Sequence, residues 1–497
     1  KSHVLGALGK AATEMRSKLG ESLSTLQRYD TPLAEATTPS LEALKALTSG
    51  RKILLNGGPA AATPFFKHAI DLDPNFALAY AYLGRVSSDV GESGNAVTYT
   101  SKAYELRDRA SEFERYFITA SYHMVVTGDL NKAEQTCQLW IQAYPRAELP
   151  HDFLSGIIYP SLGQLENAKE HGRIAIDLAP DNPISYDILA FAFLSVDQVE
   201  EAAAAEAAAQ KRNLEWPGMH STLYQIAFQR GDALGMAKQV EWSAGKPGVE
   251  DGLLDYEAAT AAYTGHLAKA RELTRQAIAS ARAADERETA AGYESEAALR
   301  EALFGNLPQA RDLLATQLPR SYDRGVHYTN ELALAFSGDA IHAQVLAEDQ
   351  ARQFPEDTLV HFYYSPTVEA QIAISRNQPD QALKILQDVS AYDFALMGPA
   401  AFQQPLFPVY VRGEAYLAAG RGREAAAEFQ KMLDHRGMLF NIPLGPLAHL
   451  GLGRAYAMQG DTAKARAAYQ DFFSMWKDAD PDIPVLLAAK AEFAKLK

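Results

Sequence analysis

The hexapeptide Ala69-Ile70-Asp71-Leu72-Asp73-Pro74 returns later in the chain as Ala175-Ile176-Asp177-Leu178-Ala179-Pro180. In each copy an apolar, helix-favouring segment stops at a proline, which cannot continue a helix. The return of the same segment indicates a chain built from repeats, and a repeat of this kind dictates how every other feature is interpreted.

A column of alanines carries the repeat through the chain. Its first seven members are 33–37 residues apart, and the later spacings reach 43 residues. A small side chain at a fixed place in the second helix of each unit lets two helices approach closely. The column consists of Ala62, Ala96, Ala133, Ala168, Ala202, Ala237, Ala270, Ala310, Ala343, Ala382, Ala425 and Ala465.

Five residues before each alanine lies the predicted turn between two helices. Nine of the twelve residues there are Gly and the others are Asp or Asn, the types that best tolerate a left-handed backbone. A helix that ends in a tight turn needs such a residue at its C-terminal end. The column consists of Gly57, Gly91, Gly128, Gly163, Asp197, Asp232, Gly265, Gly305, Gly338, Asn377, Gly420 and Gly460.

These columns, with segments such as Leu452-Gly453-Arg454-Ala455-Tyr456, resemble the tetratricopeptide repeat, a helix–turn–helix unit of 34 residues. The resemblance extends over most of the chain. It implies an all-α fold: a right-handed superhelical solenoid of about twelve helical hairpins, with a short N-terminal helical segment and a C-terminal capping helix.

The spacing and the flanks predict three regions. Residues 1–39 are expected to form an N-terminal helical linker or the end of an upstream domain, with helices over residues 3–18 and 21–28. A first array then covers residues 40–282, and a second, with longer aromatic and proline-rich insertions, covers residues 283–497. The boundary is placed where the alanine spacing rises to 40 residues.

The ends of the array carry their own signals. Thr38, followed by a proline and an early acidic residue, is predicted to cap the first helix of the first repeat. A terminal helix over residues 485–497 is expected to close the solenoid, with Lys490 and Glu492 on its polar outer face.

Composition excludes several classes of function. The chain has 497 residues and a net charge of −15, from 47 Lys and Arg against 62 Asp and Glu, and nucleic-acid binding requires a cationic footprint instead. No run of 18 apolar residues is present, so this segment is not expected to insert into a membrane. The single cysteine, Cys137, rules out an internal disulfide framework and a cysteine-based zinc site.

Motifs for catalysis or cofactor binding are absent from the sequence. The twelve histidines are scattered, without the helical pair that binds zinc. Gly245-Lys246 lacks the preceding Gly of a phosphate loop and is followed by Pro247 instead of Ser or Thr. Ser49-Gly50-Arg51-Lys52 matches Ser-x-x-Lys without any supporting motif. We therefore expect no catalytic residue, no metal and no cofactor.

The resemblance implies one functional surface, the concave groove lined by the first helix of each hairpin. Tyrosine recurs among the residues that counting from the alanine column places there, and tyrosine suits a peptide-binding groove because it gives rigid contact area. The alternative is that these tyrosines pack between helices. The predicted groove residues are Arg85, Asp89, Tyr122, Phe153, Asp187, Arg230, Tyr263, Tyr328, Tyr364, Gln371, Tyr410, Glu414 and Arg454.

The expected partner is a protein or peptide that is not acidic. The groove lacks the cluster of Lys and Asn with which carboxylate-clamp members of the family bind acidic C-termini. The net negative charge of the chain also favours a basic or neutral partner.

The run over residues 4–12, the segment over 36–45 and Tyr410-Val411-Arg412-Gly413-Glu414 are similar to large bacterial signalling proteins. In these, a repeat array follows a eukaryotic-like serine/threonine kinase or a winged-helix domain. The resemblance brings no catalytic residues. It implies an extracytoplasmic location if the array follows a single-span kinase, and a cytoplasmic one otherwise.

The sequence thus favours a non-catalytic interaction scaffold or sensor region of a bacterial signalling protein, which binds a protein segment in the groove. The alternative is a structural protein that self-associates into a homo-oligomer through its repeat surfaces. An enzyme with its site in the groove is the third and least supported hypothesis, because the chain carries no catalytic constellation.

Overall fold

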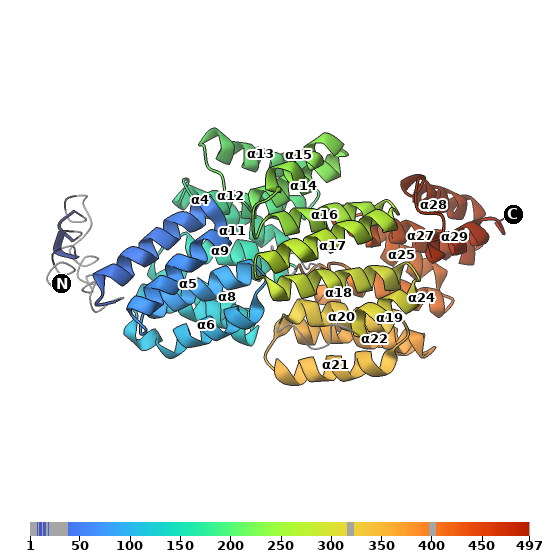
Figure 1. Ribbon diagram of the computed structural model, residues 1–497. Helices are drawn as coiled ribbons and strands as arrows, with labels where there is room; N and C mark the ends of the chain where they lie inside the picture. The colour runs from blue at the N-terminus through green and yellow to red at the C-terminus, as the bar shows by residue number, and fades with distance from the viewer. Residues whose placement is uncertain are drawn as a thin grey trace. The chain divides into compact units, whose positions relative to one another are not determined.

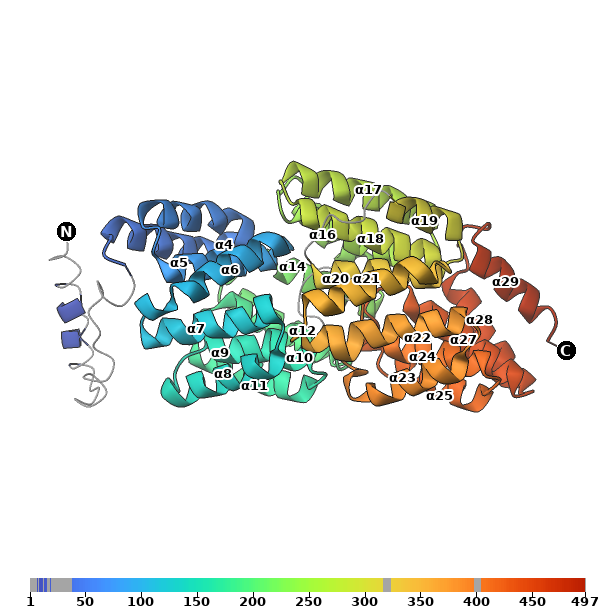
Figure 2. The same cartoon turned by 90° about the horizontal axis from the view of Figure 1, so that it is seen from below.

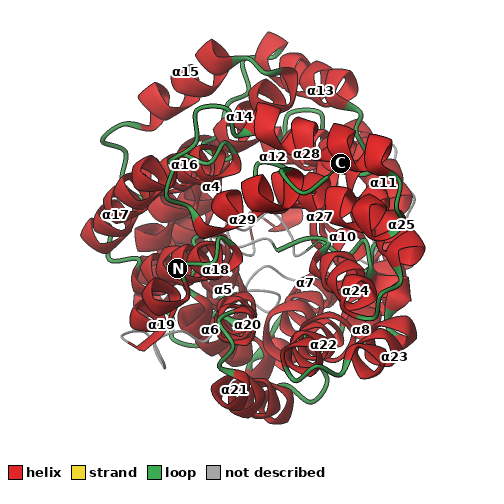
Figure 3. Cartoon of the chain, turned by 90° about the vertical axis from the view of Figure 1, so that its right-hand side faces the viewer, coloured by secondary structure: helices red, strands yellow, loops and turns green. Residues whose placement is uncertain are grey.

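A computed structural model describes residues 38–315, 323–396 and 404–496, together with residues 7, 9–11, 13–15 and 18. The regular elements in these residues are all helical, and Figure 3 shows no strand among them. The predicted all-α fold is therefore confirmed. The described part of the predicted helix over 3–18 is helical, whereas the predicted helix over 21–28 lies outside the described residues.

The chain forms two compact units, Lys1–His151 and Asp152–Lys497. In unit 1 each described helix packs on helices close to it in sequence, as expected for a repeat array. Its elements are α4 (Leu41–Leu72), α5 (Ala77–Asp89), α6 (Ser93–Glu105), η1 (Arg107–Arg109), α7 (Glu112–Tyr122), the π-helix η2 (His123–Thr127) and α8 (Leu130–Ala143). Helices α4, α5, α6 and α8 are labelled in Figure 1.

Unit 2 continues the same arrangement, beginning with α9, which crosses the boundary. Its elements are α9 (Leu149–Phe153), the π-helix η3 (Leu154–Ile158), α10 (Tyr159–Ser161), α11 (Leu165–Leu178), α12 (Pro183–Leu194), α13 (Val199–Lys211), α14 (Met219–Arg230), α15 (Ala233–Ser243), α16 (Glu250–Tyr263), α17 (Leu267–Ala283), α18 (Arg287–Leu303), α19 (Leu307–Ala315), α20 (Arg324–Phe336), α21 (Ala340–Gln353), the π-helix η4 (Val360–Tyr364), α22 (Ser365–Ser375), α23 (Pro379–Asp388), η5 (Ser390–Tyr392), α24 (Phe407–Ala418), α25 (Gly422–Leu433), α26 (Arg436–Leu439), α27 (Leu444–Met458), α28 (Thr462–Met475) and α29 (Pro484–Phe493).

The described residues form twelve hairpins when α4, which bends at Gly58, is counted as one. Eleven of the twelve alanines in the predicted column are at most 1% exposed, which confirms the column as the contact between the two helices of a hairpin. The predicted boundary between residues 282 and 283 stays a prediction, and α17 and α18 on its two sides pack together in unit 2.

The turn column is confirmed at ten of its twelve positions, where the backbone has a positive φ. In the first repeat the left-handed residue is Gly58 rather than Gly57, and in the sixth it is Gly231 rather than Asp232. Asp232 instead caps α15 by accepting a hydrogen bond from the Gly235 N–H. The predicted alignment is therefore wrong by one residue in the sixth repeat, and Ala237 is exposed.

The first helix of the array is capped by Ser40, whose hydroxyl accepts the Ala43 N–H, and not by Thr38 as predicted. The Thr38 hydroxyl is engaged elsewhere, because it donates to the Asp73 carboxylate at the end of the same hairpin. The side chain nearer to the helix start therefore takes the capping role.

Unit 2 differs from a simple array because its later segments return to its earlier helices. Asn441 donates to the Tyr256 carbonyl at 2.7 Å and accepts from Gln225 at 2.8 Å. The Gly437 N–H donates to Asp197 at 2.8 Å, and the Trp476 indole donates to the Tyr263 carbonyl at 3.0 Å. These bonds join residues about 200 positions apart in sequence and place late connecting segments against the earlier first helices.

Candidate functional site

In unit 1 the predicted groove residues remain partly accessible. Arg85 and Asp89 lie one turn apart on α5 and form an ion pair at 2.9 Å, with their side chains 21% and 23% exposed. Tyr122 is half-buried at the end of α7 and stacks on Tyr104 with ring centroids 3.9 Å apart. The Arg107 guanidinium lies 3.9 Å from the Tyr104 ring centroid, a cation–π geometry.

In unit 2 most of the predicted groove residues are buried within the packing. Tyr328 is 0% exposed and stacks on the buried Tyr364 at 4.4 Å between centroids. Phe153, Gln371 and Tyr410 are buried as well. These tyrosines pack between helices, which is the alternative to a groove position given in the sequence analysis. A partner could contact the buried side chains only if the helices separated.

Arg230 and Tyr263 are each engaged by another part of unit 2. Arg230 ends α14 and pairs with Glu200 of α13 at 2.5 Å, and the shift of register in this repeat moves it from the predicted groove position to the helix end. Tyr263 is half-buried, and its carbonyl accepts the Trp476 indole.

Arg454 is the predicted groove residue whose environment is most informative. Its guanidinium donates from Nε to Glu492 Oε2 at 3.0 Å and from Nη2 to Oε1 at 3.1 Å. The Tyr469 hydroxyl donates to the same Glu492 Oε2 at 2.8 Å. Such a two-pronged contact fixes both the position and the plane of the carboxylate. Arg454 and Tyr469 belong to the last hairpin, α27–α28, whereas Glu492 belongs to α29.

Helix α29 lies against these residues with one face. Ile483, Leu486 and Ala489 are buried and follow one another at intervals of three residues, and Glu492 continues the series. The Val485 N–H donates to the Phe304 carbonyl at 3.1 Å, at the turn between α18 and α19. Figure 2 shows α29 running from this turn past α28 at the end of the chain. Glu492 was expected on the polar outer face, and that prediction is wrong, because this residue binds the groove arginine.

Charge and burial determine the ionisation of the cradle, the pair Arg454 and Tyr469 that holds Glu492. Burial raises the pKa of the half-buried Glu414, which lies on α24, although the Arg454 charge opposes the shift. Burial disfavours the charged form of Arg454, yet the hydrogen bonds that it donates to Glu492 and the charges of Glu414 and Glu492 raise its pKa above the usual value. Burial and the bond to Glu492 also raise the pKa of Tyr469. Arg454 is therefore a permanent cation prepared for a carboxylate.

A second group of polar side chains lies on α16 and α18. The Tyr293 hydroxyl donates to Asp251 at 2.8 Å, and Gln404 donates to Glu296 at 3.3 Å. Asp255 hydrogen-bonds with Glu296, and burial raises the pKa of Asp255 to about 6 despite the nearby Arg300 charge. The group is satisfied only in part, because Asp251 Oδ1 and Arg300 Nε are buried without a hydrogen-bond partner among the described residues.

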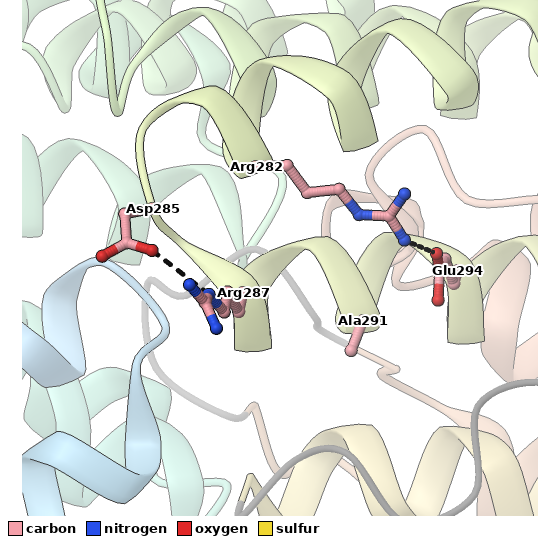
Figure 4. Close-up of a pocket in the computed structure, with 5 residues that line it drawn as sticks. All are labelled: Arg282, Asp285, Arg287, Ala291 and Glu294. Atoms are coloured by element: carbon pink, nitrogen blue, oxygen red, sulfur yellow. Dashed lines mark hydrogen bonds and ion pairs between the residues drawn. The ribbon is translucent and has the colours of Figure 1, made fainter.

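A pocket of about 670 Å³ lies where α17 turns into α18 (Figure 4). Arg282 pairs with Glu294 across it, and Arg287 pairs with Asp285 at 3.2 Å. Ala291 completes the lining. Since the two cations are matched by two carboxylates, the pocket offers neither net charge for an ion nor an unpaired base for chemistry.

The described residues bring no three His, Cys, Asp or Glu side chains together in a metal-binding arrangement. None of the described helices combines the length and the apolar character needed to cross a lipid bilayer.

The sequence analysis identified Arg454 but missed its partner on α29. Leu486, Ala489 and Glu492 recur at three-residue intervals in the sequence, and because three residues fall about 60° short of a full helical turn, these side chains span about a third of the helix surface. The expectation of a polar cap assigned that face to solvent. The arrangement can hold an amphipathic helix through apolar contacts and through an ion pair with one carboxylate.

Comparison with known proteins identifies one part of the array. Residues 410–480 match the tetratricopeptide repeat family. This range holds α24, α25, α27 and α28, so it contains Tyr410, Glu414, Arg454 and Tyr469. Repeats of this family generally mediate contacts between proteins and are typically non-catalytic.

No curated protein matches the chain. Among solved structures, the chain is similar to the TPR domain of P58(IPK), with 14% identity, 91% of this chain and 98% of that chain covered, and a TM-score of 0.22. At this score the likeness supports no conclusion about the present protein.

Proposed function

We propose that the chain is a non-catalytic interaction region, the scaffold or sensor part of a bacterial signalling protein, which binds a segment of another protein on the inner face of its repeats. The observation that supports this most is the cradle of Arg454 and Tyr469, which holds Glu492 of a separate helix at 2.8–3.1 Å. The cradle lies in the residues that match the tetratricopeptide repeat.

The proposed partner is a protein or peptide without strong negative charge. The chain carries a net charge of −15, which attracts basic or neutral segments and repels acidic ones. The occupant already present agrees with this, because α29 carries Lys490 on its exposed side and one carboxylate on its docked side. In unit 1 the accessible Arg85, Asp89 and Tyr122 are proposed as additional contact residues.

The test uses the full chain as bait, followed by cross-linking of captured proteins and mapping of the cross-links. Arg454→Glu and Arg85→Glu reverse charge on the two inner faces, and Arg423→Glu on the exposed side of α25 is the matched control. A partner that cross-links to the inner face and is lost with an inner-face variant alone supports the proposal. Partners that survive both inner-face variants contradict it.

Self-association is the second candidate function, and helix α15 is the observation in its favour. Leu234 is 84% exposed there, and Ala233 and Ala237 on the same helix are exposed as well. An uncovered apolar face of this kind is typical of a contact between chains. Sedimentation velocity over a concentration series would show a dimer that Leu234→Lys abolishes, whereas a monomer at all concentrations would eliminate this candidate.

A further inference from the structure

Helix α29 has few attachments to unit 2. Of its ten residues only Leu486 and Ala489 are buried, and Leu487 on the opposite side is 52% exposed. The preceding helix, α28, buries Ala465, Ala468, Tyr469 and Phe472. Val485, Phe493 and Leu496 pack against the same core while only partly buried, and a short helix attached largely through partly buried side chains has a lower free energy of local opening than the helices before it.

The attachments that do exist define a chemical pattern. An apolar residue recurs every third position at Ile483, Leu486 and Ala489, and a glutamate follows three residues later at Glu492. The next residue, Phe493, lies under the Arg466 guanidinium, which is 4.7 Å from its ring centroid. The last hairpin therefore holds a helix with apolar residues at the positions of Leu486 and Ala489, followed by Glu492 and Phe493.

The side chains that hold Glu492 project from helices other than α29. Arg454 projects from the rigid helix α27, and the carboxylate of Glu414, which contributes to raising the Arg454 pKa, lies on a different helix, α24. Glu414 Oε1 is buried without a hydrogen-bond partner. Removal of α29 would thus leave an arginine on the inner face, and this arginine would be free to bind another carboxylate.

We propose that α29 is an internal occupant of this groove, and that an amphipathic helix of a partner protein with the same pattern displaces it. This inference rests on the function proposed above and adds the class of partner and a means of regulation. Because α29 competes for the groove, only chains that have released α29 can bind a partner. The apparent affinity of the partner is its intrinsic affinity multiplied by the fraction of chains in which α29 is released, so weak binders are excluded.

Charge favours a different protein over a second copy as the source of the displacing helix. Two copies of the chain each carry −15 and repel one another, whereas a partner helix with lysines at the positions of Lys490 and Lys495 is attracted. We therefore assign the groove to a basic amphipathic helix with a single inward glutamate.

The test measures binding of a fluorescent peptide with the sequence of residues 481–496 to the full chain. Glu492→Lys in the chain breaks the hold on its own α29, and Ala488→Lys adds a lysine on the exposed side of the same helix as the matched control. The peptide is expected to bind the Glu492→Lys chain at least tenfold more tightly than the wild-type or Ala488→Lys chain. Adding Arg454→Glu to the Glu492→Lys chain should abolish this binding.

Equal affinity for the wild-type and Glu492→Lys chains overturns the inference, provided that hydrogen exchange shows α29 to be released. If Glu492→Lys impairs folding, Leu486→Ala replaces it, with the same expected tightening. A wild-type dimer that dissociates when the peptide is added would identify a second copy as the occupant and also overturn it. A captured partner that depends on Arg85 but binds the wild-type and Glu492→Lys chains equally would refute this inference and leave the proposed function standing.

Discussion

Hairpins α5–α6 in unit 1 and α27–α28 in unit 2 carry an arginine at the same place in the repeat, and the two arginines bind different partners. Arg85 pairs with Asp89 on its own helix, whereas Arg454 binds Glu492 on α29. The comparison extends to the units as wholes. Unit 1 helices pack on their neighbours in sequence, while unit 2 uses its connecting segments and its last helix to fill its own inner face.

The difference teaches that the repeat pattern specifies hairpins but does not specify an open groove. Whether the inner face is available depends on segments outside the repeat, such as the one around Asn441 and helix α29. Substitutions that disturb these segments should lower the stability of unit 2 and leave that of unit 1 unchanged.

The largest effect is expected for Gly437→Ala. A Cβ at this position would lie 2.2 Å from the Leu194 carbonyl oxygen and 2.8 Å from the Asp197 nitrogen. Both are backbone atoms that cannot move aside alone, so unit 2 should lose about 3 kcal/mol of stability. Gly252→Ala, on α16 in the same unit, is the control for the loss of a glycine, because an added Cβ there meets only the Tyr293 hydroxyl oxygen at 4.0 Å and the backbone is not left-handed. Hydrogen exchange resolved along the chain should show weakened protection in unit 2 and unchanged protection in unit 1.

Asn441→Ala should have the next largest effect. The variant removes hydrogen bonds with the Tyr256 carbonyl, Thr260 and Gln225, which leaves buried polar groups unsatisfied at a cost of about 2 kcal/mol. Chemical denaturation monitored by amide hydrogen exchange would measure this loss of stability. Asn167→Ala, which removes an exposed bond to Gln164 in the same unit, should change stability by less than about 0.5 kcal/mol. Equal effects of the two variants would mean that the returning segment does not hold unit 2 together.

The two units should also respond oppositely to pH. The pKa of Asp255 in unit 2 is raised to about 6, mainly by burial, so its contribution to stability is present below pH 4 and is lost as the pH rises through 6. Asp255→Asn should flatten this fall, which is on the order of 3 kcal/mol. In unit 1, burial works against ionised Asp129, yet the bonds and charge of Lys132 lower its pKa, so its contribution is lost as the pH falls. Melting curves between pH 4 and 8 that show the same slope for the wild type and the Asp255→Asn variant would contradict the assignment for unit 2.

The smallest effect is expected for Arg85→Ala. A partly exposed pair one turn apart on a helix contributes about 0.3–0.5 kcal/mol, and the contribution is screened by salt. The melting temperature of unit 1 should therefore change little, and the change should vanish in about 1 M salt. A loss several times larger would show that Arg85 has a structural role like that of Arg454.

The sequence predicted the features that repeat. The alanine column and the turn column follow from local demands, because a tight helix contact needs a small side chain and a left-handed turn needs Gly, Asn or Asp. Even the failure at Asp232 has a local reason, since Gly231 takes the left-handed conformation at no steric cost and frees Asp232 to cap α15.

The candidate site was predictable only in part. The repeat alone predicts that Arg454 is a groove residue, but the burial of Tyr328 and Tyr364 depends on what other side chains pack around them. Contacts such as Asn441 with Tyr256 join distant residues that carry no shared pattern. Counting positions within a repeat therefore shows which way a side chain points and leaves open what it meets.

The hold of Arg454 on α29 is the central claim, and a charge exchange tests it most directly. Amide hydrogen exchange across residues 485–489 would be compared in the wild type, Arg454→Glu, Glu492→Arg and the double variant. Each single variant should lose protection about tenfold, and the double variant should recover most of it because the ion pair is restored with its charges reversed. Unchanged protection in the single variants, or no recovery in the double variant, would contradict the claim that the inner face of the last hairpin holds this helix.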